Sequence, residues 1–170
     1  MPAPPPRVIL FGNSGAGKST LAARLCREGQ LAHLDLDLLA WEPTAPPTRR
    51  ALASSENDID DFIGAHDGWV IEGCYADLLS IAGSAADTAI WLNLPVAECI
   101  ANARARPWEP HKYSSPEAQD ANLPMLIDWI GAYETRADTF SRSTHQALFA
   151  GFQGRRLELN RRREADELTL

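Results

Sequence analysis

The residues with the clearest chemical potential are 12–19, which read GNSGAGKS. They match the spacing G-x-x-x-x-G-K-[ST] in full and follow a short apolar run at residues 7–11. Glycines carry no obstructing side chain and can adopt positive φ, so the backbone can turn its N–H groups toward phosphate oxygens. Lys18 can reach the β and γ phosphates, and the Ser19 hydroxyl can bind Mg²⁺. The segment, called the P-loop from here on, predicts a bound nucleoside triphosphate.

The helix predicted after the P-loop should point the positive end of its dipole at the phosphates. The alternative is a glycine-rich turn between a strand and a helix that binds no ligand. The spacing, the flanking elements and the Lys-Ser pair together disfavour that alternative. The residues expected to contact the nucleotide are Gly12, Asn13, Ser14, Gly15, Ala16, Gly17, Lys18, Ser19 and Thr20.

Two aspartates, Asp35 and Asp37, end the second predicted strand, residues 32–37. Residues two apart in a strand point to the same side, and ligands of open α/β sheets bind beyond the carboxyl ends of strands. We expect Asp35 to act at the acceptor, as the base for an attacking hydroxyl, and Asp37 to help hold Mg²⁺. We also expect this strand to neighbour the P-loop strand. The alternatives are a helix cap or a solvated loop acid.

A third acid, Glu72, ends the short apolar run WVIE at residues 69–72. A carboxylate that follows a buried strand beside the P-loop can orient metal-bound water or a substrate hydroxyl. We therefore assign Glu72 to the expected metal site together with Ser19 and Asp37. The alternative is a structural hydrogen-bond partner.

Phosphoryl transfer also requires positive charge over the migrating group, and four arginines are candidates to supply it or to hold the nucleotide. Arg104 and Arg106 end a predicted helix and open a polar segment, where they could reach the γ-phosphate. Arg136 lies on a long helix predicted over residues 126–142. Arg161 opens a basic run and could stack on the adenine. The alternative for each is an ordinary surface arginine.

The elements that must position these residues alternate between strand and helix. Such alternation predicts a parallel sheet covered on both faces, here an α/β fold in three layers with five parallel strands. The expected strands are 7–11, 32–37, 69–72, 88–94 and 156–159, the last preferred over 147–152. The expected helices are 19–28, 51–66, 78–86, 95–106, 126–142 and 164–168.

Two polar, proline-containing stretches interrupt this alternation. Residues 41–50 are predicted to be loop. Residues 108–124 contain three prolines, which argues against continuous helix and favours a mobile loop that orders over the nucleotide. We expect a single domain over residues 1–170, with a flexible tail at 1–6, an acceptor-side region at 41–66 and a lid at 107–124.

The chain has 170 residues and a net charge of −7, which argues against a broad nucleic-acid footprint. Its three cysteines are few and widely spaced, which favours reduced thiols rather than a disulfide framework or a metal site. Neither a signal peptide nor a membrane-spanning run is visible. We therefore expect a cytoplasmic protein, a monomer or weak homodimer, with no nucleic-acid or membrane partner.

The chain resembles the adenylate kinase-like small kinases of the P-loop class. It looks most like bacterial proteins labelled DNA topology modulation protein-like, which are similar to shikimate kinases. The matching segments are 12–22, 33–41, 69–75 and 87–95. Shikimate kinases carry an aspartate pair after the second strand and an Arg-Pro element in the lid, which Asp35–Asp37 and Arg106–Pro107 resemble. Their triple-glycine segment is replaced here by Glu72-Gly73-Cys74-Tyr75, which argues against shikimate itself.

The resemblance implies ATP and Mg²⁺ as cofactors and a mobile lid. The favoured function is a kinase that transfers the γ-phosphate of ATP to a hydroxyl or phosphate of an unidentified small acceptor. One alternative is a regulatory nucleotide-binding protein with weak ATPase activity and a macromolecular partner. A second alternative is a degenerate, inactive family member.

Overall fold

The computed structural model describes residues 2–170 and contains, over that range, a five-stranded sheet in which every pairing is parallel. The strand order is β2-β5-β1-β6-β7. The bounds are β1 (Arg7–Gly12), β2 (Ala32–Asp35), β5 (Trp69–Gly73), β6 (Thr88–Leu92) and β7 (Arg155–Leu159). The predicted α/β class and the preferred fifth strand are confirmed. The expectation that β2 neighbours the P-loop strand is wrong, because β5 lies between β2 and β1.

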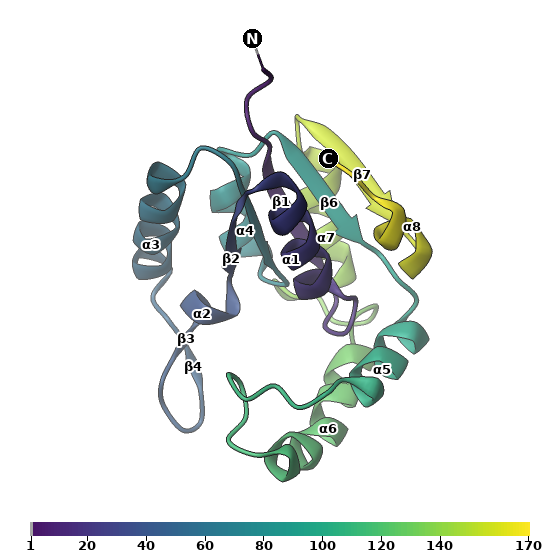
Figure 1. Cartoon of the computed structure of the whole chain (residues 1–170). Coiled ribbons are helices and arrows are strands. Elements are labelled where there is room, and N and C mark those ends of the chain that lie inside the picture. The colour runs from purple at the N-terminus through teal and green to yellow at the C-terminus, as the bar shows by residue number, and fades with distance from the viewer. Residues whose placement is uncertain (1) are drawn as a thin grey trace.

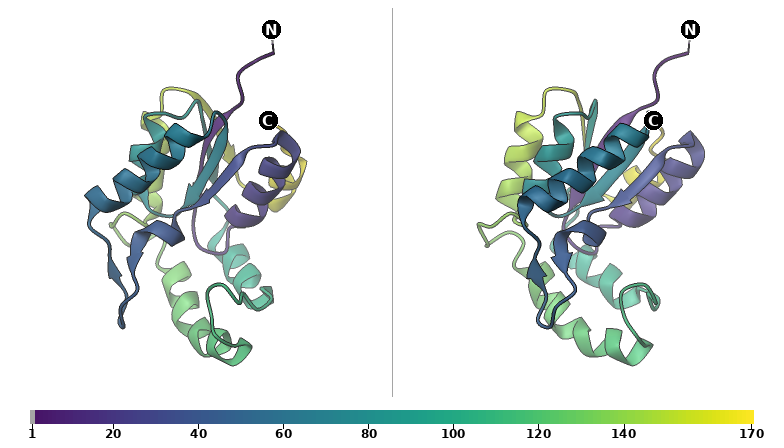
Figure 2. Two further views of the ribbon diagram at one scale, coloured as in Figure 1. Left: turned by 60° about the vertical axis from the view of Figure 1, so that its left-hand side comes forward. Right: turned by 90° about the vertical axis from the view of Figure 1, so that its left-hand side faces the viewer.

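Successive side chains of β1 point to opposite faces of the sheet, as in any strand, and so belong to two separate hydrophobic cores. Val8 and Leu10 pack with α1 (Lys18–Gly29), α5 (Val96–Ala105) and α8 (Arg162–Glu167). Ile9 and Phe11 pack on the other face with three helices. These are α3 (Leu52–Ala65), α4 (Ala76–Gly83) and α7 (Arg142–Gly151). Figures 1 and 2 show the resulting three layers.

Two segments project beyond the carboxyl ends of the strands, on the side of the P-loop (Figure 1). One is α2 (Asp37–Ala40) followed by the hairpin of β3 (Trp41–Glu42) and β4 (Thr48–Arg49). The other is the connection from α5 into α6 (Pro116–Gly131). Residues 41–50, predicted as loop, therefore hold a short antiparallel ladder. Both projections can border a ligand held by the P-loop.

The helix predicted over residues 126–142 is wrong, and so is the extent of the loop before it. α6 already begins at Pro116, where proline is tolerated because an N–H at that position would have no intrahelical acceptor. Ser115 caps the helix by accepting a hydrogen bond from the N–H of Ala118. Pro124 lies inside this helix, whose apolar residues pack on α5. The helix ends at Gly131, and Ser141 caps α7 separately. In residues 2–170 no helix has the length and apolar character needed to cross a membrane.

Candidate functional site

The P-loop joins β1 to α1 in a conformation that its glycines make accessible. Gly15 and Gly17 have φ of 79° and 90°, and Gly12 has φ of 155°. A Cβ at Gly15 would overlap the backbone carbonyl of Cys99, and one at Gly12 would overlap that of Leu92. At Gly12 and Gly15 the backbone therefore approaches β6 and α5 too closely for a larger residue. Gly17 has open space around it, and there the positive φ is what favours glycine.

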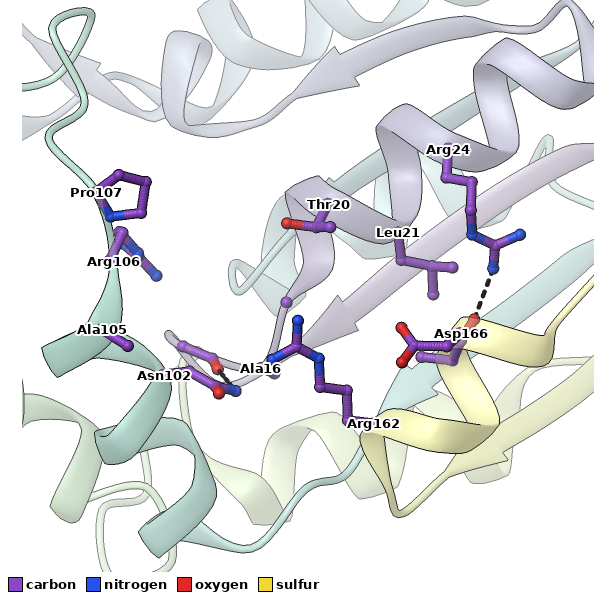
Figure 3. Close-up of a pocket in the computed structure, with 13 residues that line it drawn as sticks. Ala16, Thr20, Leu21, Arg24, Asn102, Ala105, Arg106, Pro107, Arg162 and Asp166 are labelled. Atoms are coloured by element: carbon purple, nitrogen blue, oxygen red, sulfur yellow. Dashed lines mark hydrogen bonds between the residues drawn. The ribbon is translucent and has the colours of Figure 1, made fainter.

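Three side chains hold the loop in place. Asn13 is buried and its Nδ2 donates to the carbonyl of Ile130 at 3.1 Å. Asn102, on α5, donates from Nδ2 to the carbonyl of Gly15 at 2.8 Å (Figure 3). Lys18 donates from Nζ to the carbonyl of Asn13 at 2.8 Å. The loop is thus preformed, and Lys18 lies folded along it at the start of α1. Sequence reasoning missed Asn102, because no local spacing marks it.

Ser19 and Glu72 meet beside the P-loop. The Ser19 hydroxyl donates to Glu72 Oε1 at 2.7 Å, and Glu72 is buried. Their approach follows from the pairing of β5 with β1. His33 Nε2 lies 3.3 Å from the same oxygen, and this hydrogen bond, opposed by burial, holds the pKa of His33 above its usual value. A hydroxyl and a carboxylate this close together offer oxygen ligands of the kind that Mg²⁺ prefers.

The two aspartates do not extend side by side from a strand as predicted. β2 ends at Asp35, and Asp37 stands in the first turn of α2. Asp35 Oδ1 accepts from the backbone N–H of Asp37 at 2.9 Å, because the chain turns into the helix there. Burial and the charges of Glu72 and Asp37 raise the pKa of Asp35 to about 6. Asp37, rather than Asp35, lines the cavity next to Lys18.

Asp37 is the centre of a network that links three elements. The Tyr75 hydroxyl donates to Asp37 Oδ1 at 2.5 Å, and Trp41 Nε1 donates to that hydroxyl at 2.8 Å. Lys112 Nζ lies 3.2 Å from Asp37 Oδ2. Burial opposes ionisation of Asp37, but the Lys112 ammonium and the Tyr75 hydroxyl hold its pKa below the ordinary value. Tyr75 and Lys112 come from distant parts of the chain, and sequence reasoning did not select them.

The loop that carries Tyr75 is itself fixed from the core. His145 is fully buried, and its Nε2 lies 2.8 Å from the carbonyl of Cys74. Its Nδ1 lies 2.8 Å from the Tyr133 hydroxyl, which accepts from Trp91 Nε1 at 3.2 Å. Burial lowers the pKa of His145 to about 4. A neutral histidine therefore holds the segment that borders the site.

Two cavities border the P-loop, and Arg106 and Pro107 line both of them. The first has a volume of about 330 Å³ and extends from the P-loop toward α8 (Figure 3). Its far wall carries Arg24, Arg162 and Asp166, and Figure 3 shows Arg162 reaching from α8 toward the P-loop. The second has a volume of about 350 Å³. It is lined by residues that include Lys18, Ser19, Asp37, Glu72, Glu109 and Lys112.

The other predicted arginines lie outside the residues that line these two cavities. Arg104 borders a smaller hollow between α5 and α6. Arg136 follows α6 rather than lying on a helix, and its guanidinium stacks on Trp129, 3.6 Å from the ring centroid. Arg161 precedes α8, and its neighbour Arg162 faces the first cavity instead. Of the four arginines, the structure brings Arg106 to the P-loop.

The end of the β3–β4 hairpin carries two arginines, Arg49 and Arg50, that are paired with acids. Arg49 lies 3.0 Å from Asp77 and packs against the rings of Trp41 and Tyr75. Arg50 lies 2.8 Å from Asp58 on α3. These contacts fix the hairpin to the body of the molecule, beside the Asp37 network.

The parallel sheet, its strand order and the loop after β1 together define a P-loop kinase-like fold. No family model and no curated protein matches the chain. Among solved structures, it is similar to an unliganded sugar kinase from Janibacter sp. HTCC2649 at 12% identity and a TM-score of 0.50. That alignment covers 92% of this chain and 86% of the other, and the likeness shows a shared fold. A shikimate kinase from Bacteroides thetaiotaomicron aligns at 16% identity and a TM-score of 0.46, over 85% of this chain and 96% of that one.

Proposed function

We propose that this protein is an ATP-dependent kinase that transfers the γ-phosphate of ATP to a hydroxyl or phosphate group of a small acceptor. One observation carries the proposal: the cavity that Lys18 and Ser19 line is also lined by Asp37 and Glu72. Groups suited to phosphate binding and carboxylates thus line one open cavity. Such a space can hold a phosphoryl donor beside a hydroxyl that must lose its proton.

The nucleotide would lie across both cavities. Its phosphates fit the P-loop, where backbone N–H groups and the start of α1 favour negative charge. Its base fits the first cavity, between Arg106 and α8. Lys18 would exchange the Asn13 carbonyl for phosphate oxygens. Arg161 as the adenine-stacking residue stays a prediction, with Arg162 now the better-placed neighbour.

Ser19 and Glu72 would hold Mg²⁺, with Asp37 acting through water. Mg²⁺ neutralises charge that develops on the phosphates. Within residues 2–170 no group of three or more His, Cys, Asp and Glu side chains is arranged to bind a metal. The ion would therefore take most of its ligands from phosphate and water, as Mg²⁺ commonly does.

The acceptor would enter between the hairpin and the lid, where Asp37 lines the cavity. Asp35, at the end of β2, stays the predicted base for the acceptor hydroxyl. Residues 41–66 would form the acceptor side, and residues 107–124 would close over the phosphates and exclude water. The finer resemblance to the DNA topology modulation protein-like family is part of this hypothesis. So are a cytoplasmic location and a monomeric or weakly dimeric state.

Thermal unfolding with and without Mg-ATP tests the proposal first. A ligand that binds only the folded state adds about 2.7 kcal/mol at a hundredfold excess over Kd, so we expect a clear rise in Tm. ATP with a chelator in place of Mg²⁺ is the control and should give a smaller rise. A metabolite screen for stimulated ADP release then identifies the acceptor. Absence of any shift at millimolar Mg-ATP would refute the proposal, and hydrolysis that no acceptor stimulates would favour the regulatory ATPase.

A further inference from the structure

Lys112 lies on a turn of the lid that sequence reasoning did not connect with the chemistry. The backbone N–H groups of Lys112 and Tyr113 both donate to the carbonyl of Glu109 at 3.0 Å, which closes the turn. The side chain reaches from there across the second cavity to Asp37. A residue distant in sequence from the P-loop is therefore aimed into the same space as Lys18.

The cations of this cavity are divided between its two ends. Among the described residues that line it, the cationic ones are Lys18, Arg106 and Lys112. Lys18 lies along the P-loop, and Arg106 stands at the border with the first cavity, where Glu109 pairs with it at 3.4 Å. Lys112 alone of these three contacts Asp37. It thus occupies the end of the cavity from which an acceptor would approach.

The contact between Lys112 and Asp37 is one that a ligand can replace. Both side chains are partly exposed, at 28% and 42%, and an ion pair between such groups is weak. Asp37 keeps the hydrogen bond from Tyr75 when the lysine leaves. Lysine carries its charge on a long, flexible stem and can follow a stronger negative charge, such as a triphosphate. Burial opposes its charge, but the Asp37 and Glu109 carboxylates hold the pKa of Lys112 above its usual value.

We propose that Lys112 is a catalytic residue of the phosphoryl transfer. This inference rests on the kinase activity proposed above. With nucleotide bound, its ammonium leaves Asp37 and contacts the oxygens of the migrating phosphoryl group. The bond from the acceptor oxygen to phosphorus forms as the bond to the bridging oxygen breaks, and that electron pair stays on ADP. When the acceptor is a hydroxyl, its proton passes to Asp37, whose carboxylate no longer pairs with Lys112. Lys112 stays protonated and supplies charge on the acceptor side, opposite Lys18.

The test is binding of a transition-state mimic, which needs no knowledge of the acceptor. Titration calorimetry measures Kd for Mg-ADP alone and for Mg-ADP with aluminium fluoride, which takes the place of the migrating phosphoryl group. We expect fluoride to tighten binding to the wild type. Lys112→Met should weaken the fluoride complex by roughly a hundredfold, the usual scale for one lost donor to a developing charge, and change Mg-ADP binding less than threefold.

Two further variants separate catalysis from a structural role. Lys112→Arg keeps a cation on the lid and should retain most of the fluoride-dependent gain. His111→Met alters the adjacent exposed residue of the same turn, outside the cavity, and should behave as wild type. Equal weakening of both complexes by Lys112→Met, or no weakening, overturns the inference and leaves Lys112 as a lid ion pair.

The wild-type protein separates failure of this inference from failure of the proposed function. A wild type that binds Mg-ADP and gains affinity from fluoride, with Lys112→Met unchanged, overturns only the role of Lys112. A wild type that binds Mg-ADP but gains nothing from fluoride also overturns that role. A wild type that binds no nucleotide overturns both.

Discussion

The two sides of the candidate site are built in different ways. On the proposed nucleotide side, the P-loop is anchored by the side chains of Asn13 and Asn102, and its residues Asn13 and Ala16 are each only 4% exposed. On the acceptor side, α2, the hairpin and the lid meet through side chains that are partly exposed. Two ion pairs there, Asp37–Lys112 and Arg49–Asp77, join residues that are far apart in the sequence.

This difference separates a fixed half from an adjustable half. Donors that are preorganised by backbone need no rearrangement when charge develops, which is what phosphate binding requires. Side-chain pairs can open and re-form around a ligand at small cost. The nucleotide side should therefore tolerate little change, and the acceptor side should determine which molecule is phosphorylated.

The largest expected effect is a loss of turnover when Lys18 of the P-loop is replaced. Lys18→Ala removes a positioned donor to the transferring group, which typically costs about 3–4 kcal/mol, or two to three decades in rate. The measurement is steady-state ADP release. Arg27→Ala, an exposed change in the last turn of the same helix, is the control. Turnover near the wild-type level in Lys18→Ala would remove the assigned role.

A second comparison sets the loss in free energy of unfolding caused by a change in the P-loop against the loss caused by a change beside the hairpin. Gly15→Ala places a Cβ against the carbonyl of Cys99 at positive φ, and we expect it to lower the free energy of unfolding by roughly 2–3 kcal/mol. Asp58→Asn breaks the Arg50–Asp58 pair, whose acid is 44% exposed, and should cost less than about 1 kcal/mol. Urea denaturation of both variants gives the comparison. Equal losses would show that the two halves are equally rigid.

The effect on turnover at Asp35, on the proposed acceptor side, is expected to be smaller than that at Lys18. Asp35→Asn keeps an oxygen for the N–H of Asp37 but removes the charge, so the turn into α2 should survive. In a loose transition state the acceptor oxygen has formed little of its bond to phosphorus, so removing its proton contributes little to the rate. We therefore expect acceptor-stimulated turnover to fall only about tenfold. ATP affinity should not change in an equilibrium titration. A collapse of ATP affinity would instead assign Asp35 to the metal site.

The fold could be predicted largely because its signals are local. Apolar runs such as residues 69–72 sit between polar or glycine-rich turns, and their alternation with helices dictates a parallel sheet. The order of the strands could not be obtained in this way, and β2 was placed beside β1 in error. The region of residues 108–142 also failed, because Pro116 and Pro124 argued against a helix that Ser115 caps and α5 supports.

In the candidate site, too, the features with local sequence signals could be predicted, and those that depend on distant contacts could not. The P-loop could be predicted from its spacing, its flanking elements and its Lys-Ser pair, and the structure has it between β1 and α1, while its contacts with a nucleotide stay a prediction. The geometry of the aspartates was mispredicted, because the turn at Leu36 depends on how the chain leaves the sheet. Lys112, Tyr75 and Asn102 carry no sequence signal of their own. They matter through partners 38 to 87 residues away, which only the fold brings near.

Pro124 gives α6 a mechanical property that follows from its missing N–H. The carbonyl of Asp120 cannot receive the usual intrahelical hydrogen bond from residue 124, so the helix has a weak point near its middle. Gln119, before this point, bonds the backbone of the lid at Glu109 and Pro107. Ile130, after it, accepts the hydrogen bond that anchors Asn13 of the P-loop. A bend at Pro124 would therefore move the proposed lid relative to the P-loop, because each is attached to a different half of α6.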